Sequence, residues 1–246
     1  MGPDLRTEAG PGAGRAGGRT ATTPDYGYRT AEASCTHAYL WPVVAALLRE
    51  RAPAPCRLLD LGCGNGAVAG ALQELGYAVD GVDPSESGIS LGRENYPACR
   101  FSVASAYDDL ASKCGRYPVV VCLEVIEHLY SPGAFASTLW DVLEPGGTGV
   151  ISTPFHGYWK NLALAIGNRF DTHFSPEWEG GHIKFWSERT LGAFLRTRGF
   201  VELEFRRAGR VAPLAKSMVV AFRRPSEDPA ARTEGPGGRP PSGSTR

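Results

Sequence analysis

The sequence predicts an α/β fold: a seven-stranded, mostly parallel sheet with helices on both faces and a helical lid insert. Three observations predict it. Apolar runs of strand length alternate with helix-like stretches from residue 57 to residue 198, the pattern of a parallel sheet covered on both faces. The last two apolar runs have no helix between them and therefore predict a hairpin with one antiparallel strand. A long insert rich in aromatic residues, 154–186, interrupts the alternation, and inserts of that length are usually functional when ordered.

The first half of the predicted fold alternates helix and strand without a break. Apolar residues recur at helical spacing over 39–48, where Pro42 starts or kinks the helix. A short strand over 57–61 runs directly into glycines, and a helix over 67–75 follows at once. The remaining elements of this half are a strand over 77–82, a helix over 85–95 and a strand over 100–103.

The second half contains the most apolar strand and the insert. A continuous apolar run over 119–123 is typical of a strand buried on both faces. Within the insert, apolar side chains recur at helical spacing between residues 155 and 166 and predict a helix there. The other elements are a helix over 132–143, a strand over 148–152, a helix over 188–198, and strands over 201–205 and 218–222.

Charge and composition exclude several classes of protein. Lys and Arg number 26 and Asp and Glu also number 26, so no overall basic field favours nucleic acid as a partner. The longest mostly apolar stretch, 39–48, is far shorter than the roughly 18 residues of a membrane span, and the N-terminus lacks the order of a secretory signal. Six scattered cysteines without a C-x-x-C pair argue against a zinc ribbon or a disulfide framework. We therefore expect a soluble, cytoplasmic protein with reduced thiols; the sequence leaves its oligomeric state open.

Both ends of the chain are poor in large apolar residues. Residues 1–24 are rich in Gly, Ala, Thr and Arg, and residues 224–246 are rich in Pro, Gly, Ser and Arg. Neither segment can bury enough apolar surface to offset the entropy lost on ordering. We therefore expect two disordered tails flanking one folded domain, 25–223, with 154–186 as its lid.

The most informative segment is the glycine-rich run after the first strand, Asp60-Leu-Gly62-Cys-Gly64-Asn-Gly66. Glycines allow positive φ and close approach of the backbone to a ligand, and the N–H groups of the helix that follows face whatever binds there. Gly62, Gly64 and Ala67 also fit the G-x-G-x-x-A pattern of dinucleotide-binding folds. Asp60 argues against that alternative, because a carboxylate there would repel a pyrophosphate but suits a cationic amino group.

The chain resembles the class I S-adenosylmethionine-dependent methyltransferases, which have a Rossmann-like fold. The glycine run resembles their first motif, 79–85 resembles their second strand ending in the ribose-binding acid Asp83, and 143–147 with 150–154 resembles their last turn and fifth strand. The resemblance covers about 55–223 and implies S-adenosylmethionine as cofactor. Ser105, near Asp108, departs from the family by standing where an acid often binds adenine, and Pro118 replaces a frequent Asp. The cofactor-binding residues that the resemblance implies are Asp60, Gly62, Gly64, Gly66, Asp83, Ala106, Tyr107, Leu123 and Glu124.

An acidic run with a histidine follows the fourth strand, and a second histidine, His182, comes far downstream. This pairing resembles that of ubiquinone-pathway O-methyltransferases. It also resembles small-RNA 3′-terminal 2′-O-methyltransferases, which use such residues to hold a divalent metal. The metal ligands that this resemblance would imply are Glu124, Glu127, His128 and His182. Positions i, i+3 and i+4 permit the first three to share one face of a helical turn. The same run is widespread where no metal is bound, so we favour a metal-free site with His182 and His128 as catalytic residues.

The insert supplies candidate acceptor-binding residues. Phe155, Tyr158 and Trp159 lie on its apolar stripe and Trp186 follows it, so we expect them to form a lid over the acceptor. Trp178, like Trp186, is expected to add a wall. The N-terminal helix, with Tyr26, Tyr28 and Arg29 just ahead, is expected to close the other side. His156 and His173 are weaker candidates for a catalytic base than His182. A largely uncharged aromatic pocket favours a neutral, planar or apolar small molecule.

The sequence thus predicts a methyltransferase that moves a methyl group from S-adenosylmethionine to a small-molecule acceptor, most simply a hydroxyl, in specialised or quinone-type metabolism. Two alternatives stay open at this point. The first is an RNA 2′-O-methyltransferase, for which the sequence offers no basic stripe. The second is a catalytically inactive S-adenosylmethionine-binding regulator, which would bind the cofactor without turnover. The sequence does not identify the acceptor or its reacting atom.

Overall fold

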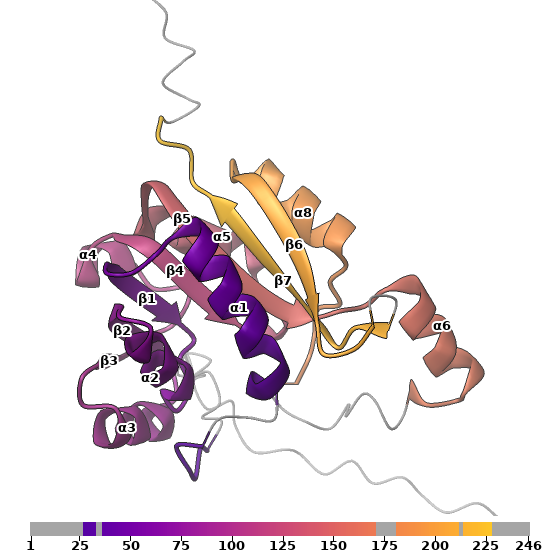
Figure 1. The fold of residues 1–246 in the computed structure, drawn as a ribbon, viewed down its shortest axis with the longest axis horizontal. Helices are drawn as coiled ribbons and strands as arrows, with labels where there is room; N and C mark the ends of the chain where they lie inside the picture. The colour runs from indigo at the N-terminus through magenta and orange to yellow at the C-terminus, as the bar shows by residue number, and fades with distance from the viewer. Residues whose placement is uncertain (1–26, 33–35, 171–180, 212–213, 228–246) are drawn as a thin grey trace, which may run out of the picture.

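The computed structural model describes residues 27–32, 36–170, 181–211 and 214–227, which form one sheet with helices on both faces (Figure 1). The predicted disordered tails, 1–24 and 224–246, lie outside these residues except for 224–227, and so do Tyr26, His173 and Trp178. The strands are β1 (Arg57–Leu61), β2 (Ala78–Asp83), β3 (Arg100–Val103), β4 (Tyr117–Leu123), β5 (Leu143–Pro154), β6 (Val201–Ala208) and β7 (Ser217–Arg223). The helices are α1 (His37–Arg51), α2 (Ala67–Glu74), α3 (Glu86–Asn95), α4 (Leu110–Cys114), the 3₁₀ turn η1 (Ile126–His128), α5 (Pro132–Val142), α6 (Tyr158–Ile166) and α8 (Glu188–Thr197).

The sheet confirms the predicted fold class. Its seven strands follow the order β3-β2-β1-β4-β5-β7-β6. Strands β1 to β5 pair in parallel, whereas β7 runs antiparallel to both β5 and β6. The order reverses between β1 and β4, because β1 connects outward to β2 on one side and β4 to β5 on the other. The crevice at such a reversal, outside the carboxyl ends of the strands, is where open α/β sheets bind ligands.

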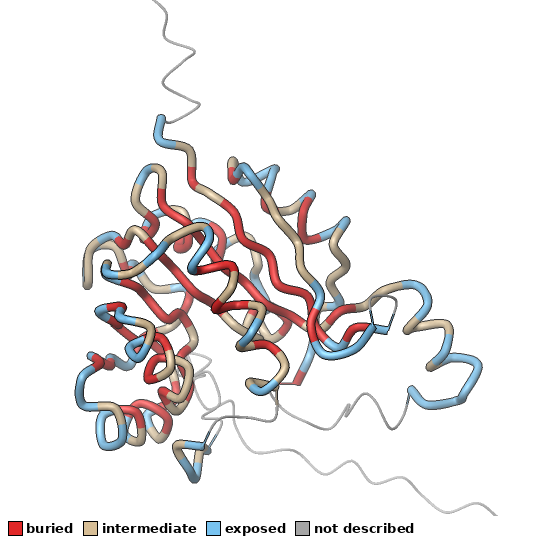
Figure 2. Tube along the Cα trace, in the orientation of Figure 1, coloured by how far each residue is buried: buried red, intermediate tan, exposed pale blue. Residues whose placement is uncertain are grey.

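Two hydrophobic cores hold the helices to the sheet, one on each face. The first contains Leu110 of α4, Phe135 of α5 and Leu191 of α8, and the second contains Val44 of α1, Leu72 of α2 and Ile89 of α3. The central strands contribute to both cores in alternation and are buried along most of their length (Figure 2). Burial on both faces explains why the sequences of these strands are continuous apolar runs.

Two elements differ from their prediction. Helix α4 was not predicted, since its five residues are too few for an apolar period; the Asp109 carboxylate caps it by accepting the Ser112 amide at 3.1 Å. Strand β5 begins at Leu143, several residues earlier than expected. Its pairing with β4 is interrupted by a bulge, at which the register shifts between Tyr117 and Val119.

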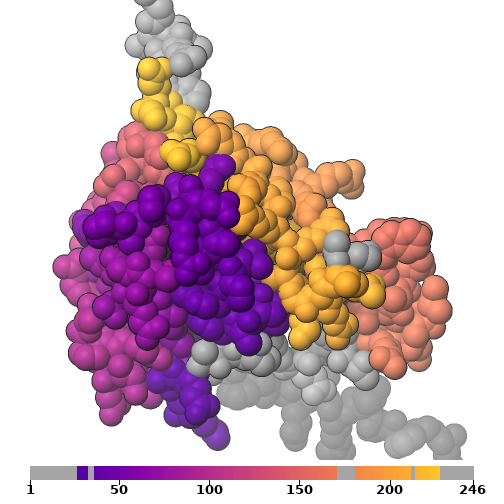
Figure 3. Space-filling view, viewed as in Figure 1, coloured from indigo at the N-terminus to yellow at the C-terminus, as the bar shows by residue number. Residues whose placement is uncertain are grey.

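Helix α6 forms where the insert's apolar spacing predicts a helix, but it does not form a lid in this structure. None of its residues is buried, and Tyr158, Trp159 and Ile166 are 72%, 63% and 79% exposed. The helix stands at the margin of the molecule, beyond the β6–β7 hairpin (Figures 1 and 3). Periodicity therefore predicted the helix correctly, whereas the covering role stays a prediction. No helix among the described residues is long and apolar enough to cross a membrane.

Candidate active site

The glycine turn between β1 and α2 adopts the conformation that its sequence requires. Gly62, Gly64 and Gly66 have φ angles of 85°, 52° and 84°, in the left-handed region that glycine enters at little cost. A Cβ on Gly62 would lie 2.5 Å from a methyl of Val125, and a Cβ on Gly64 would lie 2.6 Å from the Tyr28 hydroxyl. The turn therefore needs glycine for its backbone conformation and also for the close approach of neighbouring side chains.

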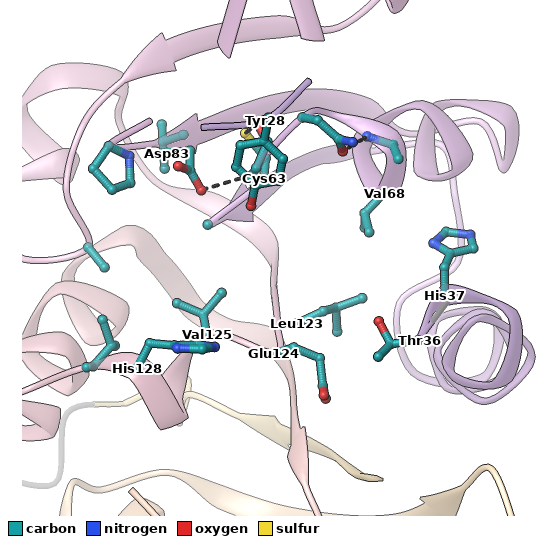
Figure 4. Close-up of a pocket in the computed structure, with 18 of the residues that line it drawn as sticks. Tyr28, Thr36, His37, Cys63, Val68, Asp83, Leu123, Glu124, Val125 and His128 are labelled. Carbon is teal, nitrogen blue, oxygen red and sulfur yellow. Dashed lines mark hydrogen bonds between the residues drawn. The ribbon is translucent and has the colours of Figure 1, made fainter. Parts of the chain in front are cut away.

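Asp83 stands at the last position of β2, beside the turn. Its carboxylate accepts the Gly64 amide at 2.9 Å through one oxygen and the Ser85 amide at 2.9 Å through the other. These bonds fix the carboxylate at the wall of the cavity, as Figure 4 shows. A ligand with two adjacent hydroxyls, such as a ribose, would find an oriented acceptor at this position.

A cavity of about 660 Å³ lies outside the carboxyl ends of β1, β2 and β4, at the reversal of strand order. In the view of Figure 4, Asp83 and Cys63 face Leu123 and Val125 across it, and His128 and His37 lie toward opposite ends. Most of the residues predicted from sequence to bind the cofactor line this cavity. They are Gly62, Gly64, Asp83, Ala106, Tyr107, Leu123 and Glu124.

Asp60 and Gly66 are the two predicted cofactor residues that lie beneath the cavity rather than on its wall. Asp60 is 1% exposed, and one of its carboxylate oxygens has no hydrogen-bond partner among the described residues. Burial, and secondarily the neighbouring Asp83, raise the pKa of Asp60 to about 8. Gly66 packs closely on Gly92 and Phe101, so it serves the packing of α2.

Glu124 leaves β4 in a left-handed conformation, with φ of 55°. Its carboxylate accepts the hydroxyls of Ser152 at 2.7 Å and Ser217 at 3.3 Å, from β5 and β7. Burial raises its pKa to about 7, although both serine hydrogen bonds act in the opposite direction. The expected helical turn begins only later, at Ile126, so Glu124 does not share a helical face with Glu127 and His128, two of its three predicted fellow metal ligands.

Glu127, His128 and His182 come together at one end of the cavity. One potential ligand atom from each lies within 4.8 Å of the others, and the two imidazole rings meet edge to face with centroids 4.8 Å apart. Both carboxylate oxygens of Glu127 are buried without a hydrogen-bond partner among the described residues. Burial and then the nearby Glu124 raise the pKa of Glu127 well above its usual range. The downstream histidine is held there because the amides of Ile183 and Lys184 donate to the Glu127 carbonyl at 2.9 and 3.0 Å.

The aromatic residues predicted to bind the acceptor do not line the cavity in this structure. Phe155 lies in the core, with the Arg207 guanidinium 4.7 Å above its ring. Trp186 packs against Phe194 with ring centroids 5.5 Å apart. Tyr158 and Trp159 contact each other on the exposed side of α6. Their role in acceptor binding stays a prediction.

Helix α1 and the segment before it supply a wall that the sequence indicated only in outline. Thr36, His37, Leu40 and Trp41 of this region line the cavity, with the His37 ring stacked on Trp41 at 5.2 Å. Burial lowers the pKa of His37. The i, i+4 spacing of His37 and Trp41 places them on one side of the helix. That spacing is visible in the sequence, but nothing there indicates which side of α1 meets the cavity.

Comparison with known families agrees with this geometry. The family described as a methyltransferase domain matches residues 36–204, more than half of the chain. The chain belongs to that family. The family implies S-adenosylmethionine as the cofactor of this chain. That the glycine turn and Asp83 bind this cofactor stays a prediction.

Individual relatives of this methyltransferase are similar over part of their length. A ubiquinone biosynthesis O-methyltransferase from Caulobacter sp. (strain K31) is 35% identical over 144 residues, which are 56% of this chain and 57% of that relative. One from Thiobacillus denitrificans is 29% identical over 154 residues, 61% of this chain and 66% of that relative. The matched stretch therefore spans somewhat more than half the length of these curated relatives.

Solved structures share the fold at low sequence identity. A protein from Pyrococcus horikoshii OT3 is 18% identical with a TM-score of 0.61, covering 79% of this chain and 93% of that one. The magnesium protoporphyrin IX methyltransferase of Synechocystis PCC 6803, whose structure has SAH bound, is 20% identical with a TM-score of 0.56 and covers 75% of this chain and 81% of that one. These matches demonstrate a common fold.

The residues present fit the family's cofactor. The cavity of about 660 Å³ falls within the usual range for sites that enclose a small organic ligand. Asp83 offers an oriented carboxylate for ribose hydroxyls, and the apolar Ala106 and Leu129 line the cavity together with Tyr107. That the cavity binds S-adenosylmethionine with its ribose against Asp83 stays a prediction.

Proposed function

We propose that this methyltransferase methylates a hydroxyl group of a neutral, planar or apolar small molecule. One observation carries the proposal: His128 and His182 meet at one end of the cofactor cavity, beside the buried Glu127. A hydroxyl acceptor must lose a proton, and an imidazole is the usual group to take one near neutral pH. The names of the relatives support the same choice, since they are O-methyltransferases of ubiquinone biosynthesis.

The residues around the cavity position the reactants. S-adenosylmethionine, when bound, supplies an electrophilic methyl group on a sulfonium with a good leaving group. Asp83 and the glycine turn orient the ligand against β1 and β2, while the backbone of Leu123 and Glu124 forms the opposite wall. Holding two reactants in line can contribute roughly 7–11 kcal/mol to lowering the barrier. The main contribution of this chain is therefore orientation.

Proton removal is the second task. We assign it to the pair His128 and His182, whose rings lie edge to face. As the acceptor oxygen forms its bond to the methyl carbon, its proton passes to an imidazole nitrogen. A placed base of this kind contributes about 10²–10⁴-fold in rate. His128 lines the cavity, and the residues on either side of His182 line it as well.

The same cluster also fits a divalent cation. Glu127, His128 and His182 would hold it, because two imidazoles and a carboxylate form a suitable donor set, and neither oxygen of that carboxylate has a hydrogen-bond partner among the described residues. Glu124 would not take part directly, since its carboxylate is bound by two serine hydroxyls from β5 and β7. The cation would act as a Lewis acid that lowers the pKa of the acceptor hydroxyl.

The experiment compares His182→Ala and His128→Ala with His156→Ala, a histidine that does not line the cavity. Turnover of a panel of phenols and catechols is measured with and without a chelator, beside the affinity for S-adenosylhomocysteine. The proposal expects the first two variants to lose roughly 10²-fold or more in kcat at unchanged cofactor affinity. If the wild-type activity does not change when chelator is added, the imidazoles alone remove the proton. If chelator abolishes the wild-type activity, a bound cation takes part. Full activity of His182→Ala contradicts both roles.

A further inference from the structure

Helix α6 differs from the other helices that the structure describes, because it alone buries none of its residues. It stands apart from the sheet (Figure 1), and none of its residues lines the cofactor cavity. It has nine residues, and a helix of that length is marginal in water by itself, since helical stability in proteins comes mostly from packing. Its own chain therefore leaves α6 with an uncovered face.

The two sides of α6 are arranged in the reverse of the usual order. At about 100° per residue, the outer face holds an uninterrupted apolar set: Tyr158, Trp159, Leu162, Ala163, Ala165 and Ile166. The polar residues lie on the inner side. The Lys160 amine donates to the Phe155 carbonyl at 3.0 Å, and the side-chain oxygen of Asn161 is buried. An apolar face turned to solvent is typical of an interaction site.

The size of this face indicates how strong its contacts can be. A whole aromatic side chain offers about 150–250 Å², so the exposed parts of Tyr158, Trp159 and Ile166 amount to on the order of 400 Å². A standard protein–protein interface buries roughly 800 Å² on each partner. The face is therefore large enough for a weak, reversible contact but not for a permanent one.

The charges around α6 distinguish a second copy of the chain from a lipid surface. Helices that lie on membranes carry Lys and Arg along their polar side, where these residues meet anionic head groups. Here Lys160 donates to a carbonyl within the chain, and the amine of its neighbour Lys216 lies 4.8 Å from the ring centroid of Tyr39. The exposed face itself carries no charge, so two copies can bring it together without like-charge repulsion.

The outer face is also complementary to itself. Two antiparallel α6 helices related by a two-fold axis at Leu162 place Trp159 opposite Ala165 of the second copy and Tyr158 opposite Ile166 of the second copy. Each aromatic side chain then meets a smaller aliphatic one, which lets the two surfaces interdigitate, and the opposed helix dipoles attract. We propose that two copies of this chain associate through α6 in this antiparallel arrangement. The proposal does not depend on the proposed function.

The test follows the mass of the full chain by sedimentation velocity at concentrations from about 1 to 200 µM, so that mass action reveals a weak dimer. The wild type should form a reversible dimer with a dissociation constant in the micromolar range. Ile166→Glu should raise that constant about 10-fold or more, because it brings an unpaired charge into the contact. Tyr158→Lys should do the same. The two substitutions in one chain should restore the dimer, because each lysine then meets a glutamate of the other copy.

Val201→Glu is the matched control, because Val201 is an exposed apolar residue on the edge strand β6 and not on α6. It should dimerise as the wild type does. Below the dissociation constant the chain is a monomer, in which substitutions on the outer face of α6 should leave the free energy of unfolding unchanged. That measurement verifies that the variants are folded.

Four results overturn the proposal. The wild type stays monomeric at every concentration, Ile166→Glu dimerises as strongly as the wild type, or the double variant dimerises no better than the single ones. The fourth is flotation of the wild type with neutral or anionic phospholipid vesicles, abolished by Ile166→Glu, which would assign the outer face of α6 to lipid instead.

Discussion

Replacing Asp60 by asparagine tests the physical description of the site most directly. Asp60 is a carboxyl group buried beneath the glycine turn, and one of its oxygens has no partner among the described residues. Asparagine has nearly the same shape but carries no charge. Because burial raises the pKa of Asp60 to about 8, the folded chain keeps this group protonated at neutral pH.

The sign of the effect follows from linkage between proton binding and folding. The unfolded chain releases the Asp60 proton near 3.8, the ordinary pKa of an aspartate, whereas the folded chain releases it near 8. Between these values the folded state binds more protons, so this group's contribution to stability is full below the unfolded pKa and is lost as pH rises through the folded pKa. The slope is about 1.4 kcal/mol per pH unit, which amounts to roughly 3 kcal/mol between pH 5 and pH 7.

Denaturant unfolding of both proteins at pH 5, 6, 7 and 8, without ligand, measures this difference. Asp60→Asn should become more stable relative to wild type as pH rises, by about 1.4 kcal/mol per unit until the folded pKa is reached. Titrating groups that do not interact with Asp60, such as Glu127, contribute equally to both proteins and cancel in the difference. Asp141→Asn, at an exposed position, should keep a constant offset from wild type. Parallel stability curves for Asp60→Asn and wild type would refute the assignment of a protonated, buried Asp60.

Three further changes test the cavity and the insert. Asp83→Ala should weaken the binding of S-adenosylhomocysteine, measured by calorimetry, by about 1–3 kcal/mol. Unchanged affinity in a folded variant would contradict the ribose contact. Gly62→Ala should lower the free energy of unfolding by at least about 1–3 kcal/mol, because φ is 85° and Val125 fills the space of a Cβ; a variant as stable as wild type would show that the turn relaxes. Trp159→Ala should leave the free energy of unfolding within about 0.5 kcal/mol and cofactor affinity unchanged, and a larger loss would contradict its exposed placement on α6.

The cofactor side of the site could be predicted because its residues either are adjacent in the sequence or lie at the ends of neighbouring parallel strands. The glycine turn is a contiguous strand–turn–helix, so its sequence alone defines its backbone. Asp83 is the last residue of the parallel strand β2, and the residue before it, Val82, pairs with Leu61, which precedes the turn. Once a parallel sheet is predicted, the carboxyl ends of β1 and β2 meet at one edge, and Asp83 must lie beside Gly62 and Gly64.

The acceptor side could not be predicted in the same way, because the spacing of residues in the sequence does not determine the backbone conformation and the long-range contacts that form it. Positions i, i+3 and i+4 place Glu124 with Glu127 and His128 only if the chain is helical from its first member. The left-handed φ of Glu124 turns its side chain toward Ser152 and Ser217 instead. His182 reaches His128 through two backbone hydrogen bonds to the Glu127 carbonyl, a contact between segments far apart in the chain.

The sequence by itself determined the α/β class with its terminal hairpin, the glycine turn and the acid at the end of β2, because each follows from periodicity or from backbone rules over a few adjacent residues. Only the tertiary structure decided which side of α1 lines the cavity, and that Tyr158, Trp159 and Ile166 of α6 are exposed while Phe155 before the helix is buried. Those outcomes depend on how whole elements pack against one another. Apolar residues at helical spacing indicate that a helix has an apolar face. Which element packs against that face depends on contacts between residues far apart in the sequence.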